Sequence, residues 1–283
     1  MKTTIKSAIM VVLSAITVLL VVHFAPVIEY ETPVEITTTT TTKQAHANGC
    51  DNYTDVKDLV AYINIPNTDI EDAVVQASDN DYYLRRNKYG SYSFAGCYFA
   101  DYECDMANLS QNTIVYGHNL RDESRLFGQL NRFKDLEFYK TTPLITFDIK
   151  SEALRWKVFG VFIVNTLEED GEVFYYLNPN FNSQAEFMDF TTEIKHRSLI
   201  NTTVDIQEND KILLLSTCDY TVDNNWRLVI ASRLVRDEES EEVDVENATV
   251  NENPLYPDGW YRRFGGVKPT FAETTQPVTV KQN

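Results

Sequence analysis

Short apolar runs separated by polar turns follow one another from about residue 53 to residue 236. Runs of this length, rich in β-branched and aromatic side chains and bounded by turn residues, are typical of β-strands. The predicted strands cover residues 61–65, 73–76, 96–100, 113–116, 144–149, 155–166, 211–216 and 226–235. Eight strands in one domain predict a mainly β fold that closes into a barrel.

Two segments of the same region have helical rather than strand spacing. The first covers residues 124–133. The second covers residues 183–195 and opens with Ser183 and Glu186, the sequence pattern of a capping box. Its apolar face is formed by Phe187, Phe190 and Ile194. Such a stripe ordinarily packs against a core, so both segments are predicted to be peripheral helices of the barrel.

Residues 7–28 form an apolar run of 22 residues without a formal charge. As a helix this run would extend roughly 33 Å, which is enough to cross the hydrocarbon core of a membrane. Lys2 and Lys6 precede it and Glu29 follows it, so the positive-inside rule places the N-terminus in the cytoplasm and the bulk of the chain outside the cell. The alternative is a cleaved signal peptide. The run is longer than the apolar part of a usual signal peptide, and the small-x-small site at residues 45–47 lies well beyond it, which favours an uncleaved anchor.

Composition then divides the chain into four parts. Residues 1–29 are the cytoplasmic start and the transmembrane anchor, and residues 30–52 are a Thr-rich stalk with too little apolar surface to offset its ordering entropy. Residues 53–236 are the predicted barrel domain. Residues 237–283 begin with six acidic side chains in eight positions, which predict an extended and solvated linker. The aromatic cluster that follows, residues 254–264, either packs on the barrel or forms a partner site, and packing on the barrel is the expectation.

The charge balance narrows the range of functions. The chain has 25 Lys and Arg against 42 Asp and Glu, a formal net charge of −17, which argues against a general electrostatic grip on nucleic acid. The four cysteines and four histidines form no zinc-ribbon pattern, and no metal site is expected. Cys97 and Cys104 flank a short loop, and their spacing leaves both free thiols and a disulfide open.

Three side chains stand where predicted strands end or begin. Cys218 follows the apolar run 212–215, Arg227 lies at the start of the next strand, and His118 follows the run 113–116. If the strands that carry Cys218 and Arg227 pair, these two side chains can lie next to each other, with His118 presented at the same barrel edge.

This combination of side chains suits acyl transfer. A thiol has a pKa near 8.5, so a nucleophilic cysteine needs a neighbouring imidazole or guanidinium to form or use its thiolate. Histidine can act as acid and as base near neutral pH. Arginine keeps its charge and presents N–H donors to the oxygen that becomes negative when a carbonyl is attacked. No cofactor is required for such a reaction, and none is expected.

The segment Leu215-Ser216-Thr217-Cys218 with the downstream Arg227, and the segment 116–119 (Tyr-Gly-His-Asn) about a hundred residues earlier, resemble the sortases, the cysteine transpeptidases of Gram-positive cell surfaces. Within that family, residues 93–101 (SFAGCYFAD) and 116–130 (YGHNLRDESRLFGQL) are similar to class B enzymes. The resemblance runs from about residue 53 to residue 235 and implies the eight-stranded sortase barrel.

The resemblance also implies a mechanism. Cys218 would attack the carbonyl after Thr in the C-terminal sorting signal of a secreted surface protein, and an amine of cell-wall peptidoglycan would resolve the thioacyl-enzyme. His118 would protonate the leaving amine and deprotonate the incoming one, and Arg227 would hold the substrate and stabilise the oxyanion. The residues that resemble substrate-binding positions are Asn80, Leu84, Tyr176, Leu177, Ser216 and Thr217.

Several alternatives keep the same residues. A pilin lysine as acceptor would build fibres, water as acceptor would make the enzyme a cysteine endopeptidase, and a tethered peptide-binding module would have the groove without turnover. The intact Cys218, His118 and Arg227 argue against the last of these. The chain also departs from class B, which often carries acidic residues at both positions after the cysteine, because here Asp219 is followed by Tyr220.

Overall fold

The structure is a computed structural model that describes residues 46–120 and 125–271. These residues belong to one compact unit, Thr41–Asn283. Over the described ranges, no helix is both long and apolar enough to cross a membrane. The predicted membrane span, residues 7–28, lies outside the described residues.

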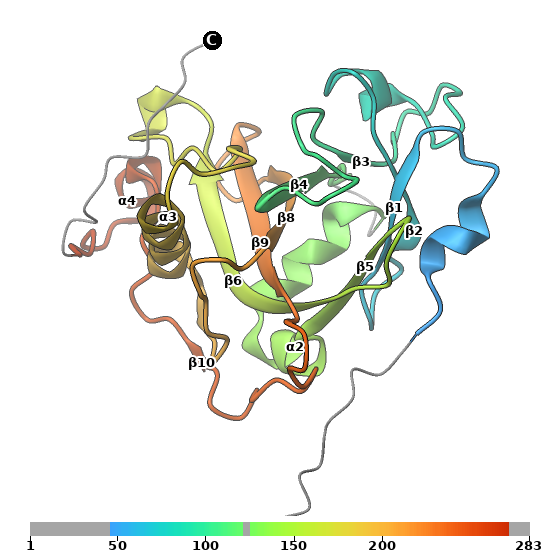
Figure 1. The fold of residues 1–283 in the computed structure, drawn as a ribbon. Helices are drawn as coiled ribbons and strands as arrows, with labels where there is room; N and C mark the ends of the chain where they lie inside the picture. Colours follow the sequence, from blue (N-terminus) through green and yellow to red (C-terminus); the bar gives the residue numbers. More distant parts are fainter. Residues whose placement is uncertain (1–45, 121–124, 272–283) are drawn as a thin grey trace, which may run out of the picture. The chain divides into compact units, whose positions relative to one another are not determined.

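Eight strands close into a barrel in the order β1-β2-β3-β4-β8-β9-β6-β5, as Figure 1 shows. Their bounds are β1 Leu59–Asn64, β2 Glu71–Val75, β3 Tyr98–Ala100, β4 Asn112–Tyr116, β5 Leu144–Ile149, β6 Arg155–Asn165, β8 Ile212–Asp219 and β9 Trp226–Leu234. Each corresponds to one of the eight runs found in the sequence, so the predicted mainly β barrel is confirmed. Two further strands, β7 (Ile200–Asn201) and β10 (Thr249–Val250), pair with each other outside the barrel and were not predicted.

Strand β8 is central to the architecture because it pairs with β4 in parallel and with β9 in antiparallel orientation. A strand covered on both faces is a continuous apolar run rather than an alternating one. Ile212, Leu213, Leu214 and Leu215 have no exposed surface, in agreement with this rule. The polar residues that follow this run therefore emerge together where β4, β8 and β9 meet.

Helix α3 (Gln184–Arg197) begins as its capping residues predict. The Ser183 hydroxyl accepts from the backbone N–H of Glu186 at 3.1 Å. The Glu186 carboxylate turns back to the N–H of Asn182 at 2.7 Å, one residue before the position that an ideal capping box uses. Its three predicted apolar residues are fully buried, and the helix packs on β6 (Figure 1).

The other predicted helix, residues 124–133, is a 3₁₀ helix, η3 (Phe127–Lys134), over its described part. It is followed by a short α-helix, α2 (Leu136–Thr141), which starts at the N-cap Asp135 and was not predicted. Six residues are too few to show a helical stripe in the sequence.

Residues 46–52, the described end of the predicted stalk, pack on the barrel. The Asp148 carboxylate of β5, which has no exposed surface, accepts from the N–H of Gly49 at 2.8 Å and lies 2.9 Å from the His46 ring. The side chain of Asn48 donates to the carbonyl of Ile149 at 2.7 Å, and Cys50 is only 4% exposed. The folded unit therefore starts before residue 53.

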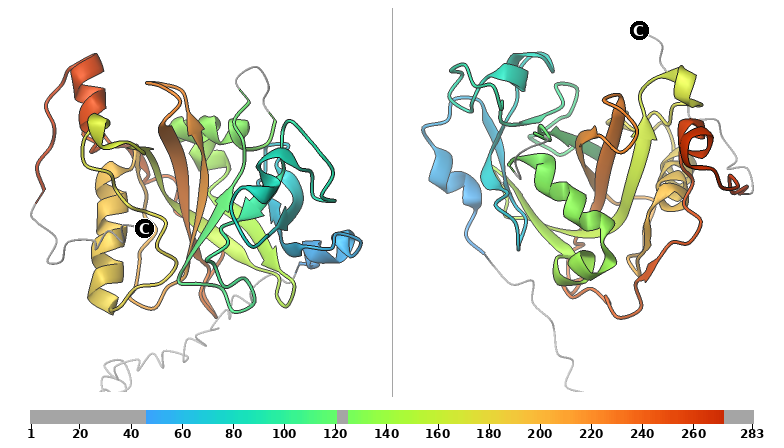
Figure 2. Two further views of the ribbon diagram at one scale, coloured as in Figure 1. Left: turned by 90° about the horizontal axis from the view of Figure 1, so that it is seen from above. Right: turned by 180° about the vertical axis from the view of Figure 1, so that it is seen from behind.

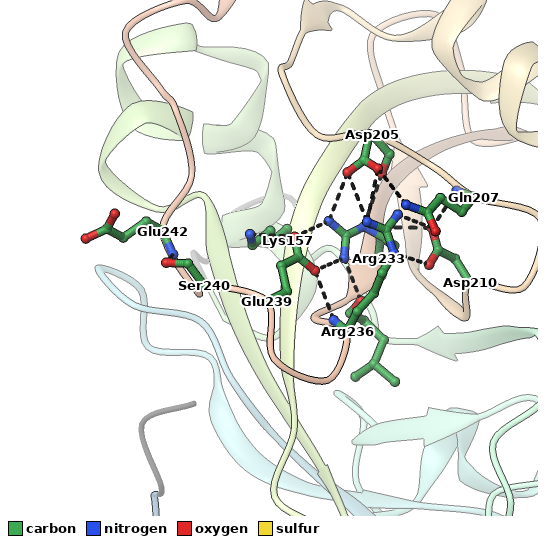
Figure 3. A network of polar contacts seen from close by, with 10 residues as sticks. Lys157, Asp205, Gln207, Asp210, Arg233, Arg236, Glu239, Ser240 and Glu242 are labelled. Atoms are coloured by element: carbon green, nitrogen blue, oxygen red, sulfur yellow. Dashed lines mark hydrogen bonds and ion pairs between the residues drawn. The ribbon is translucent and has the colours of Figure 1, made fainter. Parts of the chain in front are cut away.

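The acidic segment after β9 is held more firmly than a solvated linker. Figure 3 shows Arg233, which is 1% exposed, between the carboxylates of Glu239 and Asp205. Glu239 also accepts from Lys157 of β6 at 2.8 Å. Burial alone would raise the pKa of Glu239, but the hydrogen bonds from Arg233 and Lys157 hold that pKa well below its ordinary value. Asp237, Glu238, Glu242 and Asp244 are exposed as expected, whereas Glu239 instead ties the segment to the barrel.

Glu239→Gln is expected to lower the free energy of unfolding at pH 7 by about 2 kcal/mol, because it removes a charged acceptor from a buried guanidinium. A lowered pKa in the folded state stabilises the protein above the ordinary value of about 4.5, and this contribution is lost as the pH falls toward the folded-state pKa. The stability difference between wild type and variant should therefore be constant near neutral pH and shrink below pH 4.5. Denaturant titrations from pH 3 to pH 7 measure it, and a pH-independent gap would contradict the assignment.

Candidate active site

Cys218 lies near the end of β8, directly opposite Arg227 of β9 in the antiparallel register. Opposed residues of neighbouring strands project from the same face of the sheet, so the thiol and the guanidinium start from adjacent backbone positions. The guanidinium donates to the carbonyls of Asn224 at 3.2 Å and Trp226 at 3.0 Å, which holds it at the strand end. Cys218 and Arg227 thus lie opposite each other at the end of the strand pair and line the same cavity.

Exposure distinguishes Cys218 from the other thiols. All four cysteines are free, and the other three are buried, so the open alternative of a disulfide between Cys97 and Cys104 is not realised. Burial raises the pKa of Cys50, Cys97 and Cys104 to about 12, which keeps these thiols protonated at neutral pH. Cys218 is half-buried and is the thiol that a substrate can reach.

His118 reaches the site because β4 runs parallel to β8. Tyr116 is the register partner of Ser216, and His118 and Cys218 each lie two residues beyond this pair. The two chain segments are then linked by side chains: the Thr217 hydroxyl donates to the carbonyl of Gly117 at 2.7 Å, and the Asn119 amide donates to the carbonyl of Cys218 at 2.8 Å. The histidine and the cysteine are therefore fixed to the same edge.

The ring of His118 is oriented by a backbone carbonyl. Its Nε2 lies 2.9 Å from the oxygen of Leu84, in the connection between β2 and β3, so Nε2 carries the proton and donates it. Gly96 permits this approach: it has φ +66°, and a Cβ there would lie 2.9 Å from the oxygen of Leu84 and 3.2 Å from the His118 ring. Nδ1 is then the nitrogen that can accept a proton when the ring is neutral.

Cys218, His118 and Arg227 line one cavity of about 320 Å³. Of the residues predicted to bind substrate, four line the same cavity: Asn80, Leu84, Ser216 and Thr217. A second cavity of about 770 Å³, next to Phe94 and Tyr220, also includes His118 and Cys218 in its wall. Cys218 and His118 consequently border both cavities.

The other two predicted substrate residues have different positions. Tyr176 is 6% exposed and its hydroxyl shares a hydrogen bond of 2.8 Å with the hydroxyl of Ser216, so it supports the cavity from behind. Burial raises the pKa of Tyr176, which keeps that hydroxyl protonated. Leu177 is partly buried and packs against the barrel core.

A buried carboxylate next to the cavity was missed in the sequence. Asp101 is 3% exposed and accepts from the Asn80 amide at 2.9 Å and from the Tyr116 hydroxyl at 2.7 Å. Burial and the neighbouring Asp101 raise the pKa of Tyr116, so the phenol remains a donor. Asn80 also accepts from the N–H of Tyr102 at 3.0 Å, which fixes its amide at the cavity wall. The only signal in the sequence was a lone Asp directly after the apolar strand 98–100.

Asp219 and Tyr220, the two residues after the cysteine, do not line the cavity of about 320 Å³. Each contacts a neighbouring segment instead. Asp219 has no exposed surface and forms an ion pair with Lys134 of η3. The hydroxyl of Tyr220, the second residue after the cysteine, donates to the carbonyl of Asn119 at 2.9 Å. This hydrogen bond adds a further link between the histidine and cysteine segments.

The geometry suits nucleophilic acyl transfer by a thiol. Cys218 can supply the nucleophile, His118 a transferable proton, and Arg227 the positive charge for a developing oxyanion. Within residues 46–120 and 125–271, no group of His, Cys, Asp and Glu side chains is arranged to hold a metal ion.

Comparisons with known proteins agree with this chemistry. Residues 63–235, more than half of the chain, match the family model of the Sortase domain. The chain is 33% identical to sortase B of Listeria monocytogenes over 180 residues, which is 63% of this chain and 70% of that protein. It superposes on sortase B from B. anthracis in complex with AAEK1 with a TM-score of 0.58 and 34% identity, covering 66% of this chain and 84% of that one. A Staphylococcus aureus sortase B-substrate complex gives a TM-score of 0.59 at 27% identity, with coverage of 66% and 84%. The chain therefore belongs to the sortase family, as a cysteine transpeptidase of class B.

Proposed function

We propose that this sortase cleaves the C-terminal sorting signal of secreted surface proteins after a threonine and transfers the protein to an amine of cell-wall peptidoglycan. The observation that supports the proposal most directly is that Cys218 and Arg227 are register partners and that His118 lines the same cavity. The relative from Staphylococcus aureus is described as a sortase B-substrate complex, which supports a peptide as the donor.

In this proposal each of the three side chains has one part in the reaction. The Cys218 thiol gives its proton to Nδ1 of His118, the thiolate sulfur attacks the threonine carbonyl carbon, and the Arg227 guanidinium stabilises the resulting oxyanion. When the intermediate collapses, the C–N bond breaks and His118 delivers its proton to the departing amine. The acyl group remains on sulfur as a thioester. An incoming amine then attacks the thioester, loses a proton to His118, and releases Cys218 for the next cycle.

The amine acceptor enters through the larger cavity in this proposal, while the sorting peptide occupies the smaller one. Both cavities include Cys218 and His118, so the thioester and the acid–base group are accessible from either side. We propose further that residues 7–28 anchor the enzyme in the cell membrane as a single span. The N-terminus would then be cytoplasmic and the catalytic unit extracellular, where both substrates are found.

One experiment tests the donor, the acceptor and the nucleophile together. The full-length chain in detergent is incubated with a library of fluorogenic sorting peptides, with and without a short amine, and Cys218 is examined for an acyl adduct by mass spectrometry. An adduct that disappears faster with amine supports a transpeptidase. An adduct that reacts equally fast with water alone indicates an endopeptidase, and a lysine peptide that outcompetes peptidoglycan amines indicates pilin assembly. No adduct with any peptide would support the binding module.

Arg227→Ala is expected to lower kcat/KM for acylation about 100-fold and to leave the fold intact, because removal of one oxyanion donor typically costs this much. Arg227→Lys keeps the charge but not the planar pair of donors, so its activity should lie between those of wild type and Arg227→Ala. Quenched time courses of acylation measure kcat/KM, and thermal melting shows whether the fold is intact. Unchanged acylation by Arg227→Ala would remove the guanidinium from the mechanism.

A further inference from the structure

The chain continues well beyond the part that matches the sortase family, which ends at residue 235. Residues 249–271, called here the C-terminal strap, follow the acidic segment. Strand β10 of the strap pairs with β7, the N–H of Asn251 donates to the carbonyl of Leu199 at 2.9 Å, and the N–H of Leu255 donates to the carbonyl of His196 at 2.8 Å. The strap thus passes along the C-terminal end of α3, and Figure 1 shows its helix α4 (Asp258–Phe264) beside α3.

Helix α4 lies against the 3₁₀ turn η4 (Glu168–Asp170), in the connection between β6 and α3, as both views of Figure 2 show. Two glycines make this approach possible. A Cβ at Gly259 of α4 would lie 2.5 Å from Oδ1 of Asp170 and 2.9 Å from Cζ2 of Trp226. A Cβ at Gly171, which has φ +112°, would lie 2.8 Å from Asp258. A side chain at Gly259 would have to displace the side chains of Asp170 and Trp226, and one at Gly171 would have to displace that of Asp258.

Asp170 joins the strap to the start of β9. Its Oδ2 accepts from the indole N–H of Trp226 at 2.9 Å, and its Oδ1 accepts from Arg262 of α4 at 3.2 Å. Arg262 is more than half exposed, so this ion pair contributes little energy by itself. The packing carries more of the contact: the Trp260 ring lies 6.5 Å from the Trp226 ring and stacks on Tyr256 at 3.9 Å.

Trp226 directly precedes Arg227 in the chain. It is the first residue of β9, it has no exposed surface, and its carbonyl accepts from the Arg227 guanidinium at 3.0 Å. The indole that α4 contacts therefore belongs to the residue directly before Arg227, the register partner of Cys218. The same connection between β6 and α3 also carries Tyr176, whose hydroxyl bonds to Ser216 two residues before the cysteine.

We propose that the C-terminal strap is a positioning element for the active site: α4 clamps Asp170 and Trp226, and thereby fixes the Arg227 guanidinium at the place where the oxyanion forms. This inference rests on the proposed role of Arg227. It assigns a function in catalysis to a segment that lies outside the family match and contacts neither Cys218 nor His118.

A double-mutant cycle tests the coupling between the C-terminal strap and Arg227. Trp260→Ala and Gly259→Val are expected to lower kcat/KM for acylation about tenfold, since a displacement of about 1 Å at a catalytic group can cost more than that. In the Arg227→Ala background the same strap substitutions should change kcat/KM less than twofold, because the group they position is gone. Arg263→Ala is the control within α4: its guanidinium lies over Phe264 and not on Asp170, so kcat/KM should stay at the wild-type value. If the strap only stabilised the fold, its substitutions would lower kcat/KM by the same factor in the wild-type and Arg227→Ala backgrounds. This result would overturn the proposal.

Hydrogen exchange gives a readout that needs no substrate. In Trp260→Ala, amides of residues 167–176 and 224–229 are expected to exchange about tenfold faster, with β1 and β5 unchanged. If wild type forms no acyl-enzyme but this exchange pattern is found, the proposed sorting reaction is wrong, whereas the contact of α4 with Asp170 and Trp226 is supported. If wild type forms the acyl-enzyme but exchange at these residues is unchanged in Trp260→Ala, the proposed positioning role of the strap is refuted.

Discussion

Cys218→Ala is expected to abolish formation of the acyl-enzyme, with a loss of at least about 10⁴-fold in peptide cleavage. No described thiol can replace it, because burial raises the pKa of Cys50, Cys97 and Cys104 to about 12 and keeps these thiols protonated. The measurement is mass spectrometry of the enzyme after incubation with a sorting peptide that wild type cleaves.

Cys97→Ala is the matched control for this variant, since it removes one buried thiol and leaves the cavity unchanged. It should form the adduct at the rate of wild type, with a small loss of thermal stability from the lost packing. Transpeptidation that persists in Cys218→Ala would remove the thioester mechanism outright.

His118→Ala is expected to lower kcat/KM for an amide substrate about 1000-fold, within the range of general acid–base catalysis. The amine leaves only when it is protonated, and His118 is the acid that lines the cavity with Cys218. An ester of the same sorting peptide has a leaving group that needs less protonation. With the ester, the loss should shrink to about tenfold.

The comparison of amide and ester substrates distinguishes acid catalysis by His118 from a structural role of this residue. His118 also donates to the carbonyl of Leu84, so its removal could loosen the wall of the cavity. A loosened wall would slow both substrates by the same factor. Equal losses for the amide and the ester would therefore show that His118 does not act as the acid in this step.

The barrel could be predicted because each of its strands leaves a local signal. β5 and β6 follow one another as long apolar runs, and the uninterrupted leucines of β8 mark a strand covered on both faces. The strands β7 and β10 leave no such signal, since two residues are too few to show an alternation of apolar and polar positions. They form only because the strap returns to the end of α3, which is information that no short window of sequence contains.

The reactive residues could be predicted for a related reason. Cys218 and Arg227 are close in the chain and their strands are neighbours, so pairing in register was the simplest arrangement. His118 is a hundred residues away, but it follows the predicted strand 113–116, which placed it at the same barrel edge before the resemblance implied its role. Tyr176 and Asp101 could not be placed, because whether a polar side chain faces a groove or lies behind it depends on packing from distant elements. The role of Gly259 and Gly171 was equally hidden, since each is defined by a close approach of two segments about ninety residues apart.

The attachment of residues 46–50 to β5 has a mechanical consequence. β5 is four places from β4 in either direction around the barrel, and it is three places from β8 by way of β6 and β9. A pulling force transmitted through His46 and Gly49 acts first on Asp148 of β5 and is then distributed over the hydrogen bonds to β1 and β6. The strands that hold His118 and Cys218 are the last to bear that load.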